Sequence, residues 1–206
     1  MLHPDLEPLL ERGAPIFLLV ICAIVFAESG LLFGFFLPGD SLLFSAGLVA
    51  ALAGQPHLGV LILCVFVAAV LGDQVGYMFG NKVGPSIFRR PDSRFFKQEN
   101  VVKTHEFFEK HGPKALILAR FVPIVRTFTP ILAGVSNMKY LTFVTFNVVG
   151  GAIWSVAGIL LGYGLGKRFP ELETYITPVV IVIVLLSLIP VFLEVRKGRQ
   201  RTRSIT

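Results

Sequence analysis

Long stretches of this 206-residue chain carry no charge. No basic residue lies between Arg12 and Lys82, and no charged residue of either sign lies within 141–166 or 174–193. A helix needs about 20 predominantly apolar residues to cross the core of a bilayer. With 54% hydrophobic residues and a mean hydropathy of +0.74, the sequence predicts an all-helical polytopic membrane protein and excludes a soluble domain.

The basic residues indicate how the chain crosses the membrane. The net charge of +6 is concentrated in a polar loop at 81–114 and a tail at 196–206, so it indicates cytoplasmic segments rather than nucleic-acid binding. With the tail inside, the turn at 167–173 lies outside. The segment 115–135 then begins and ends on the inside, and it is too short to cross twice. It is therefore predicted to be a re-entrant hairpin, broken at its tip.

A second hairpin is predicted in the first half of the chain. The span 58–80 places the turn before it outside, so the break near residues 38–41 belongs to a hairpin that enters from the outside. The sequence leaves open whether residues 15–27 cross fully. A short internal match, GYMFG at 76–80 with GYGLG at 162–166, supports two opposed re-entrant hairpins in an inverted repeat.

Five ionisable residues lie inside these otherwise apolar stretches: Glu28, Asp40, Asp73, Arg120 and Arg126. A charge in the bilayer core costs roughly 2.5–3.5 kcal/mol on the insertion scale. The chain must therefore pair these groups or hydrate them. Transport of an ion or of a charged headgroup is the first hypothesis.

The first predicted helix break offers groups that bind an anion. Pro38 and Gly39 interrupt the helix, and Asp40 and Ser41 are expected to cap a half-helix that begins near Leu42. The N-terminus of such a half-helix carries roughly +0.5 charge and free N–H groups, which favour an anion. In the alternative interpretation, Asp40 only caps the helix and takes no part in transport.

The second predicted break lies between Pro123 and Pro130 and contains Arg126, Thr127 and Thr129. The Thr129-Pro130 pair is expected to start the equivalent half-helix, because proline is favoured at the first helical position. A guanidinium fork fits a phosphate group. The predicted anion site comprises Arg120, Arg126, Ser41, Thr127 and Thr129.

The three acids are expected to couple transport to protons. Glu28 and Asp40 would face the arginines, and Glu28 is expected to exchange a proton during transport. In a purely structural alternative, the arginines lock Glu28 or Asp40 in buried ion pairs that fix the fold. Asp73 lies among glycines spaced four residues apart, a pattern typical of helix packing, so a structural hydrogen bond is an equal alternative for it.

Three ordered motifs resemble the signatures of the DedA family, also called the SNARE-associated or VTT-domain family. The first is FAE at 26–28 followed by LPGD at 37–40, where the family often has Glu in place of Asp40. The second is GDQVGY at 72–77, and the third is ARFVPIVR at 119–126, followed by Pro130, Ala133 and Gly134. The resemblance covers roughly residues 15–195.

The resemblance implies two opposed re-entrant hairpins and a role in maintaining the bacterial envelope. It implies lipid translocation that depends on the proton gradient, notably of undecaprenyl phosphate back across the membrane. Carried over to the matching positions, Glu28 and Asp40 would be the acidic pair, and Arg120 and Arg126 the essential arginines.

We therefore expect an N-terminal interfacial segment at 1–14, a membrane domain at 15–195 and a basic cytoplasmic tail at 196–206. Within the membrane domain, the first half covers about 15–84, the second half about 101–166, and a last span 175–193. The protein is expected in the bacterial inner membrane, with its C-terminus in the cytoplasm.

The expected function is proton-gradient-linked flipping of a phosphate-headed lipid, either a polyprenyl phosphate or a phospholipid. A small-cation/proton antiporter is one alternative, which the arginines disfavour because they repel cations. A general phospholipid scramblase is another. The expected partners are this lipid substrate, protons and membrane lipids, with no nucleic acid, and an oligomer is left open.

An enzyme is not expected, because no histidine lies beside the arginines and no GxSxG or GxGD pattern occurs. All four histidines fall in predicted loops, so neither a metal site nor a cofactor is expected. Cys22 and Cys64 lie in separate apolar segments, where they are interpreted as small hydrophobic residues rather than a disulfide.

Overall fold

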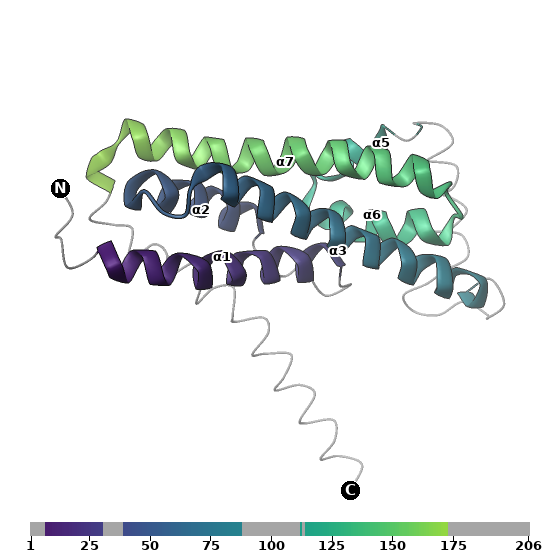
Figure 1. Ribbon diagram of the computed structural model, residues 1–206. Helices are drawn as coiled ribbons and strands as arrows, with labels where there is room; N and C mark the ends of the chain where they lie inside the picture. Colours follow the sequence, from purple (N-terminus) through teal and green to yellow (C-terminus); the bar gives the residue numbers. More distant parts are fainter. Residues whose placement is uncertain (1–6, 31–38, 88–111, 113, 173–206) are drawn as a thin grey trace, which may run out of the picture.

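The computed structural model describes residues 7–30, 39–87, 112 and 114–172. Pro38, most of the basic loop, the predicted last span 175–193 and the tail 196–206 lie outside these residues. The described residues confirm the all-helical class (Figure 1). A short 3-10 turn at Pro170–Leu172 follows six α-helices, which are α1 (Glu7–Gly30), α2 (Gly39–Ala53), α3 (Leu58–Ile87), α5 (Ala115–Ala119), α6 (Pro123–Val135) and α7 (Tyr140–Arg168).

Three of these helices, α1, α3 and α7, are long and apolar enough to cross a membrane. α3 and α7 coincide with the predicted spans, and α1 continues without interruption through Pro15. By contrast, α2 has 15 residues and α6 has 13. At about 1.5 Å per residue they cover roughly 20–23 Å, less than the hydrocarbon core of about 30 Å. The protein is a multi-pass membrane protein whose two short helices are too short to cross by themselves.

Helices α2 and α6 each pack chiefly against a long helix from the other half of the sequence. α2 lies along α7, while α6 and α1 both lie along α3, where Gly76 is in contact with both of them. In Figure 1, α7 (green) and α1 (purple) lie on opposite sides of the bundle, and α3 crosses between them toward α6. Each half of the chain therefore packs its short helix, α2 or α6, onto a long helix of the other half.

Glycines permit the close approach of α2 to α7. A Cβ atom added at Gly47 of α2 would overlap the carbonyl oxygen of Ile159, and one added at Gly162 of α7 would overlap the carbonyl oxygen of Phe44. These are backbone atoms of the facing helix, which cannot move aside as a flexible side chain can. The two backbones touch because neither glycine has a side chain.

The contact between α6 and α3 repeats this arrangement. A Cβ atom at Gly134 of α6 would overlap the carbonyl oxygen of Tyr77, and one at Gly80 of α3 would overlap that of Ile131. By these contacts Gly80 corresponds to Gly162, whereas the sequence match pairs it with the glycine four residues later. The correspondence between α3 and α7 is therefore shifted by one helical turn relative to the sequence match. Glycines recur every four residues in both helices, so a shift of one turn aligns glycine with glycine again.

We expect Gly162→Ala to destabilise the protein, because the new methyl group would be forced into the backbone of α2. Overpacking of this kind costs typically about 1–3 kcal/mol. Gly164 is a matched control on the same helix, since a Cβ atom there would meet nothing within 4 Å. Gly164→Ala should be neutral or slightly stabilising. Thermal unfolding of both variants in detergent tests this, and equal stability would contradict the α2–α7 contact.

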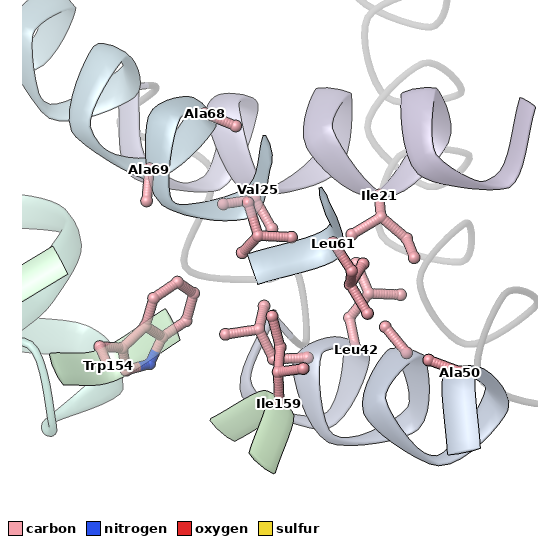
Figure 2. Packing of buried hydrophobic residues seen from close by; sticks show 12 residues of the cluster. Ile21, Val25, Leu42, Ala50, Leu61, Ala68, Ala69, Trp154 and Ile159 are labelled. Carbon is pink, nitrogen blue, oxygen red and sulfur yellow. The ribbon is translucent and has the colours of Figure 1, made fainter. Parts of the chain in front are cut away.

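Among the described residues, the hydrophobic core has two parts. The larger part joins α1, α2, α3 and α7, and Figure 2 shows Val25, Leu61 and Ile159 converging in it, with Trp154 at its edge. The smaller part contains Tyr77 and Phe143 together with Leu116 from the start of α5 and Ala133 from the end of α6. The segment 115–135 therefore begins and ends at the same end of the bundle.

The last residue of α1 lies beside the middle of α3. A Cβ atom at Gly30, the last residue of α1, would meet the backbone oxygen of Gly72 at 2.9 Å. Gly72 lies half-way along α3. A Cβ atom at Gly39, the first residue of α2, would overlap the Glu28 carboxylate. The end of α1 and the start of α2 thus meet at half the depth of the bundle.

Candidate functional site

All five ionisable residues of the apolar stretches gather where the short helices begin. Glu28 lies in the last turn of α1, Asp40 in the first turn of α2 and Arg126 in the first turn of α6. Arg120 follows the last residue of α5, and Asp73 lies half-way along α3. These residues form two ion-paired clusters, one around each arginine.

The first cluster is built around Arg126, of which only 2% is exposed. Its guanidinium donates through Nη2 to Glu28 and through Nη1 to Oδ1 of Asp40, the latter at 3.0 Å. It also lies over the indole ring of Trp154, 4.5 Å from the ring centroid. Trp154 Nε1 donates to the same Asp40 oxygen at 2.7 Å. One guanidinium therefore ties together α1, α2, α6 and α7.

The second cluster is built around Arg120, which is also buried. Its Nη2 donates to Oδ2 of Asp73 on α3 and to Oδ1 of Asn147 on α7. Gly150 leaves room for this side chain, because a Cβ atom there would lie 3.0 Å from the arginine Cδ. Arg120 thus connects the break after α5 with both neighbouring long helices.

The two clusters together hold three carboxylates and two guanidiniums. With all five groups charged, one negative charge is in excess, so a single bound proton would make the set neutral. Four of the five side chains are almost fully buried, but the Asp40 side chain is 52% exposed. Asp40 is therefore the charged side chain through which this site is open to the surface of the described structure.

The start of α2 differs from the prediction. The helix begins at Gly39 rather than near Leu42, which places Asp40 inside the first turn and leaves Ser41 exposed beside it. The Asp40 carboxylate binds Arg126 and Trp154, so its contacts go beyond those of a helix cap. A carboxylate in the first turn also interacts favourably with the helix dipole.

The expected half-helix start at Thr129-Pro130 is wrong. Helix α6 begins at Pro123, after Val122 in an extended conformation, and it continues through Pro130. Proline is well suited to the first helical position, so Pro123 takes that place. The Thr129 hydroxyl donates to the Val125 carbonyl of its own helix at 2.6 Å.

This earlier start moves the break to residues 120–122, directly after α5. Arg126 and Thr127 are consequently helical and buried, rather than part of an open loop. Of the predicted anion-binding groups, the structure brings Arg126 and Thr127 into the first residues of α6, with Arg120 at the break before them.

Sequence reasoning missed two polar partners of the arginines. Nothing in the local sequence marks Trp154 as more than an aromatic residue of an apolar span, although its N–H group and its ring hold Asp40 and Arg126. Asn147 was not singled out. It is a buried amide within a stretch that carries no charge, and such a group in a membrane helix needs a partner, which is the signal that would have identified it.

We expect Asn147→Leu to lower stability, because the buried guanidinium of Arg120 would lose an acceptor. Leaving such a donor without its partner costs about 1–3 kcal/mol. Thr145→Val is the matched control, since the exposed Thr145 hydroxyl bonds only to its own helix at Leu141 among the described contacts. Thermal unfolding of the two variants in detergent measures the difference, and a loss no greater than that of the control would contradict the contact.

Comparisons with known proteins agree on one family. The VTT domain family model matches residues 37–164, a range that includes Asp40, Asp73, Arg120 and Arg126. An uncharacterized membrane protein of Mycobacterium tuberculosis is 47% identical over 185 residues, which cover 89% of this chain and 81% of that protein. No solved structure matches the chain.

Two relatives from Escherichia coli strain K12 carry descriptive names. Protein DedA is 38% identical over 204 residues, which cover 97% of this chain and 92% of DedA. Inner membrane protein YqjA is 38% identical over 150 residues, which cover 72% of this chain and 67% of YqjA. With three ordered motifs, the family-model match and these relatives, the chain belongs to the DedA family of membrane proteins and carries its VTT domain.

Proposed function

We propose that this protein is a translocase of the bacterial inner membrane that flips a phosphate-headed lipid, such as undecaprenyl phosphate, at the expense of the proton gradient. The observation that carries the proposal is Arg126, a buried guanidinium in the first turn of α6 that is held by two carboxylates. A guanidinium binds phosphate and carboxylate through the same paired N–H groups. A lipid phosphate can therefore take the place of a carboxylate on Arg126.

Competition between phosphate and carboxylate provides the coupling to protons. In the described state, Glu28 and Asp40 occupy Arg126. When a proton binds one of these acids, its ion pair with Arg126 weakens, and N–H donors become free for the phosphate. When the proton leaves, the carboxylate returns to Arg126 and expels the phosphate. Proton uptake on one side of the membrane and release on the other would then drive the lipid across.

We further propose that α1–α2 and α5–α6 are two opposed re-entrant hairpins related by an inverted repeat. The matched contacts of Gly47 with α7 and of Gly134 with α3 support this relation. So do the positions of the end of α1, which lies beside the middle of α3, and of the start of α2, which meets Glu28. The first turns of α2 and α6 then meet near the membrane midplane, where Arg126 can be reached from either side in alternation.

The proposed topology predicts which loops share a face of the membrane. Single cysteines at Lys114 and Lys139, which flank the second hairpin, should both react with a membrane-impermeant thiol reagent from the cytoplasm. A cysteine at His57 should react only from the outside. All three positions are exposed. The background should lack Cys22 and Cys64, which are free thiols. Labelling of Lys114 and Lys139 positions from opposite faces would rule out a re-entrant second hairpin.

One observation favours a second candidate, a small-cation/proton antiporter. The described site has one carboxylate in excess, and that carboxylate, Asp40, is half-exposed. A cation could bind there, although the nearby guanidinium of Arg126 opposes it. A general phospholipid scramblase is the third candidate, and it would move lipids without a gradient.

A reconstitution assay separates these functions. Purified protein in liposomes is tested with a polyprenyl phosphate, phosphatidic acid and phosphatidylcholine, with and without a pH gradient. We expect gradient-dependent flipping of the phosphate monoesters, with every lipid recovered chemically unchanged, because the proposed reaction forms and breaks no covalent bond. Gradient-independent flipping of all three lipids would identify a scramblase. Cation-coupled proton flux without lipid movement would identify the antiporter.

A further inference from the structure

A pocket of about 230 Å³ lies between α2 and α7, beside the hydrogen bond from Trp154 to Asp40. Its lining is apolar apart from these two residues. The other lining residues include Phe44, Phe121, Ala157 and Leu161. The pocket therefore has one polar end, and that end is shared with the Arg126 cluster through Asp40.

The apolar rim of the pocket is exposed on the surface of the described structure. Leu161, on the candidate span α7, is 68% exposed, and Phe121, in the break after α5, is 52% exposed. Apolar side chains exposed on such a surface contact acyl chains rather than water. A molecule that enters between α2 and α7 thus comes from the bilayer and meets the charged cluster at the inner end.

We propose that this pocket binds the carbons next to the phosphate of a single lipid, which enters sideways between α2 and α7 so that its phosphate reaches Arg126. The inference rests on the translocase function proposed above and names the place where the substrate chain lies. Cavities that hold whole small ligands measure roughly 300–1,000 Å³. The smaller volume here fits only the chain segment nearest to the headgroup, and the rest of the chain stays in the bilayer.

The fluorescence of Trp154 can report directly on this pocket, because Trp154 is the single tryptophan of the chain and lines the pocket. The full chain is reconstituted in phosphatidylcholine vesicles that contain a brominated quencher lipid. We expect phosphatidic acid brominated near the headgroup to quench Trp154 more strongly than phosphatidylcholine with the same brominated chains. Bromine near the end of the chain should quench less than bromine near the headgroup.

Two matched variants on α7 test whether the headgroup-specific quenching of Trp154 arises in the pocket. Ala157→Phe places a ring in the space proposed for the lipid chain, and it should weaken the specific quenching by about tenfold, which corresponds to about 1.4 kcal/mol of binding free energy. Ala152→Phe places the same ring on the same helix at a residue that does not line the pocket, and it should retain the wild-type response. Flipping should be slowed by Ala157→Phe and unchanged by Ala152→Phe, with both variants equally stable on thermal unfolding.

The outcomes separate this inference from the proposed function. Equal quenching by the two brominated headgroups, in a protein that flips phosphate lipids, would overturn the pocket and leave the translocase function standing. Specific quenching that survives Ala157→Phe would also overturn the pocket. If no phosphate lipid is flipped and none quenches specifically, both proposals are wrong.

Discussion

Replacing Arg126 with alanine is expected to abolish transport and to lower the free energy of unfolding by about 3–5 kcal/mol, the usual effect of removing one partner of a buried ion pair. Glu28 would be left buried without its cation, and Asp40 would lose one of its two donors. Arg120→Ala should behave similarly through Asp73. Membrane insertion should persist in both variants, because the apolar spans are unchanged. Flipping in liposomes and thermal unfolding in detergent measure the two effects.

Two further variants separate substrate binding from structural support. The double variant Arg126→Ala with Glu28→Gln removes both charges of the buried pair and should recover most of the stability, but no transport. Arg126→Lys keeps the charge but loses the planar fork that serves Glu28 and Asp40 together, so it should rescue transport poorly. Full activity of the lysine variant at normal expression would remove the case for bidentate phosphate binding.

Replacing Glu28 with glutamine is expected to stop gradient-driven transport while lipid binding remains. Glutamine has nearly the same shape and still offers an oxygen to Arg126, but it cannot exchange a proton at neutral pH. In the proposed cycle, the Nη2 side of Arg126 would then face no carboxylate that could expel the phosphate, and Asp40 alone would compete with the lipid. Flipping with and without a pH gradient, together with quenching of Trp154 by brominated phosphatidic acid, measures transport and binding separately.

The matched control for this variant is Glu171→Gln in the 3-10 turn after α7, where the side chain is exposed and far along the chain from the charged clusters. It should transport like the wild type. Normal gradient-driven flipping by Glu28→Gln would show that Glu28 is only a structural partner of Arg126.

The membrane class, two long spans and the arginine–carboxylate site could be predicted from the sequence. Long apolar runs identify α3 and α7 because the requirement is local, a matter of length and polarity. The gathering of Glu28, Asp40 and Arg126 followed from the cost of an unpaired charge in the membrane, which leaves few alternatives to ion pairing or hydration. The sequence leaves open which acid pairs with which arginine, because that depends on helices far apart in the chain.

The helix start of α6 and the register of the two halves could not be predicted. Pro123 and Pro130 are both acceptable at a first helical position, and only the surrounding packing decides between them. The partner roles of Trp154 and Asn147 depend on α7 meeting α2 and α3, which no local pattern encodes. For the same reason, contacts between distant segments decide which of two equivalent glycine registers is used.

The pairing of α2 with α7 has a consequence for the biosynthesis of the protein. The ribosome completes α2 at Ala53 but does not begin α7 until Tyr140, and chains grow at about 5–20 residues per second. During this interval the glycine face of α2 has no helix to cover it, and α2 is too short to be anchored as a span. The first half of the nascent chain must therefore remain incompletely folded, in or beside the insertion machinery, until α7 has been made. Produced as two separate polypeptides, the halves should each be degraded alone and should accumulate only when made together.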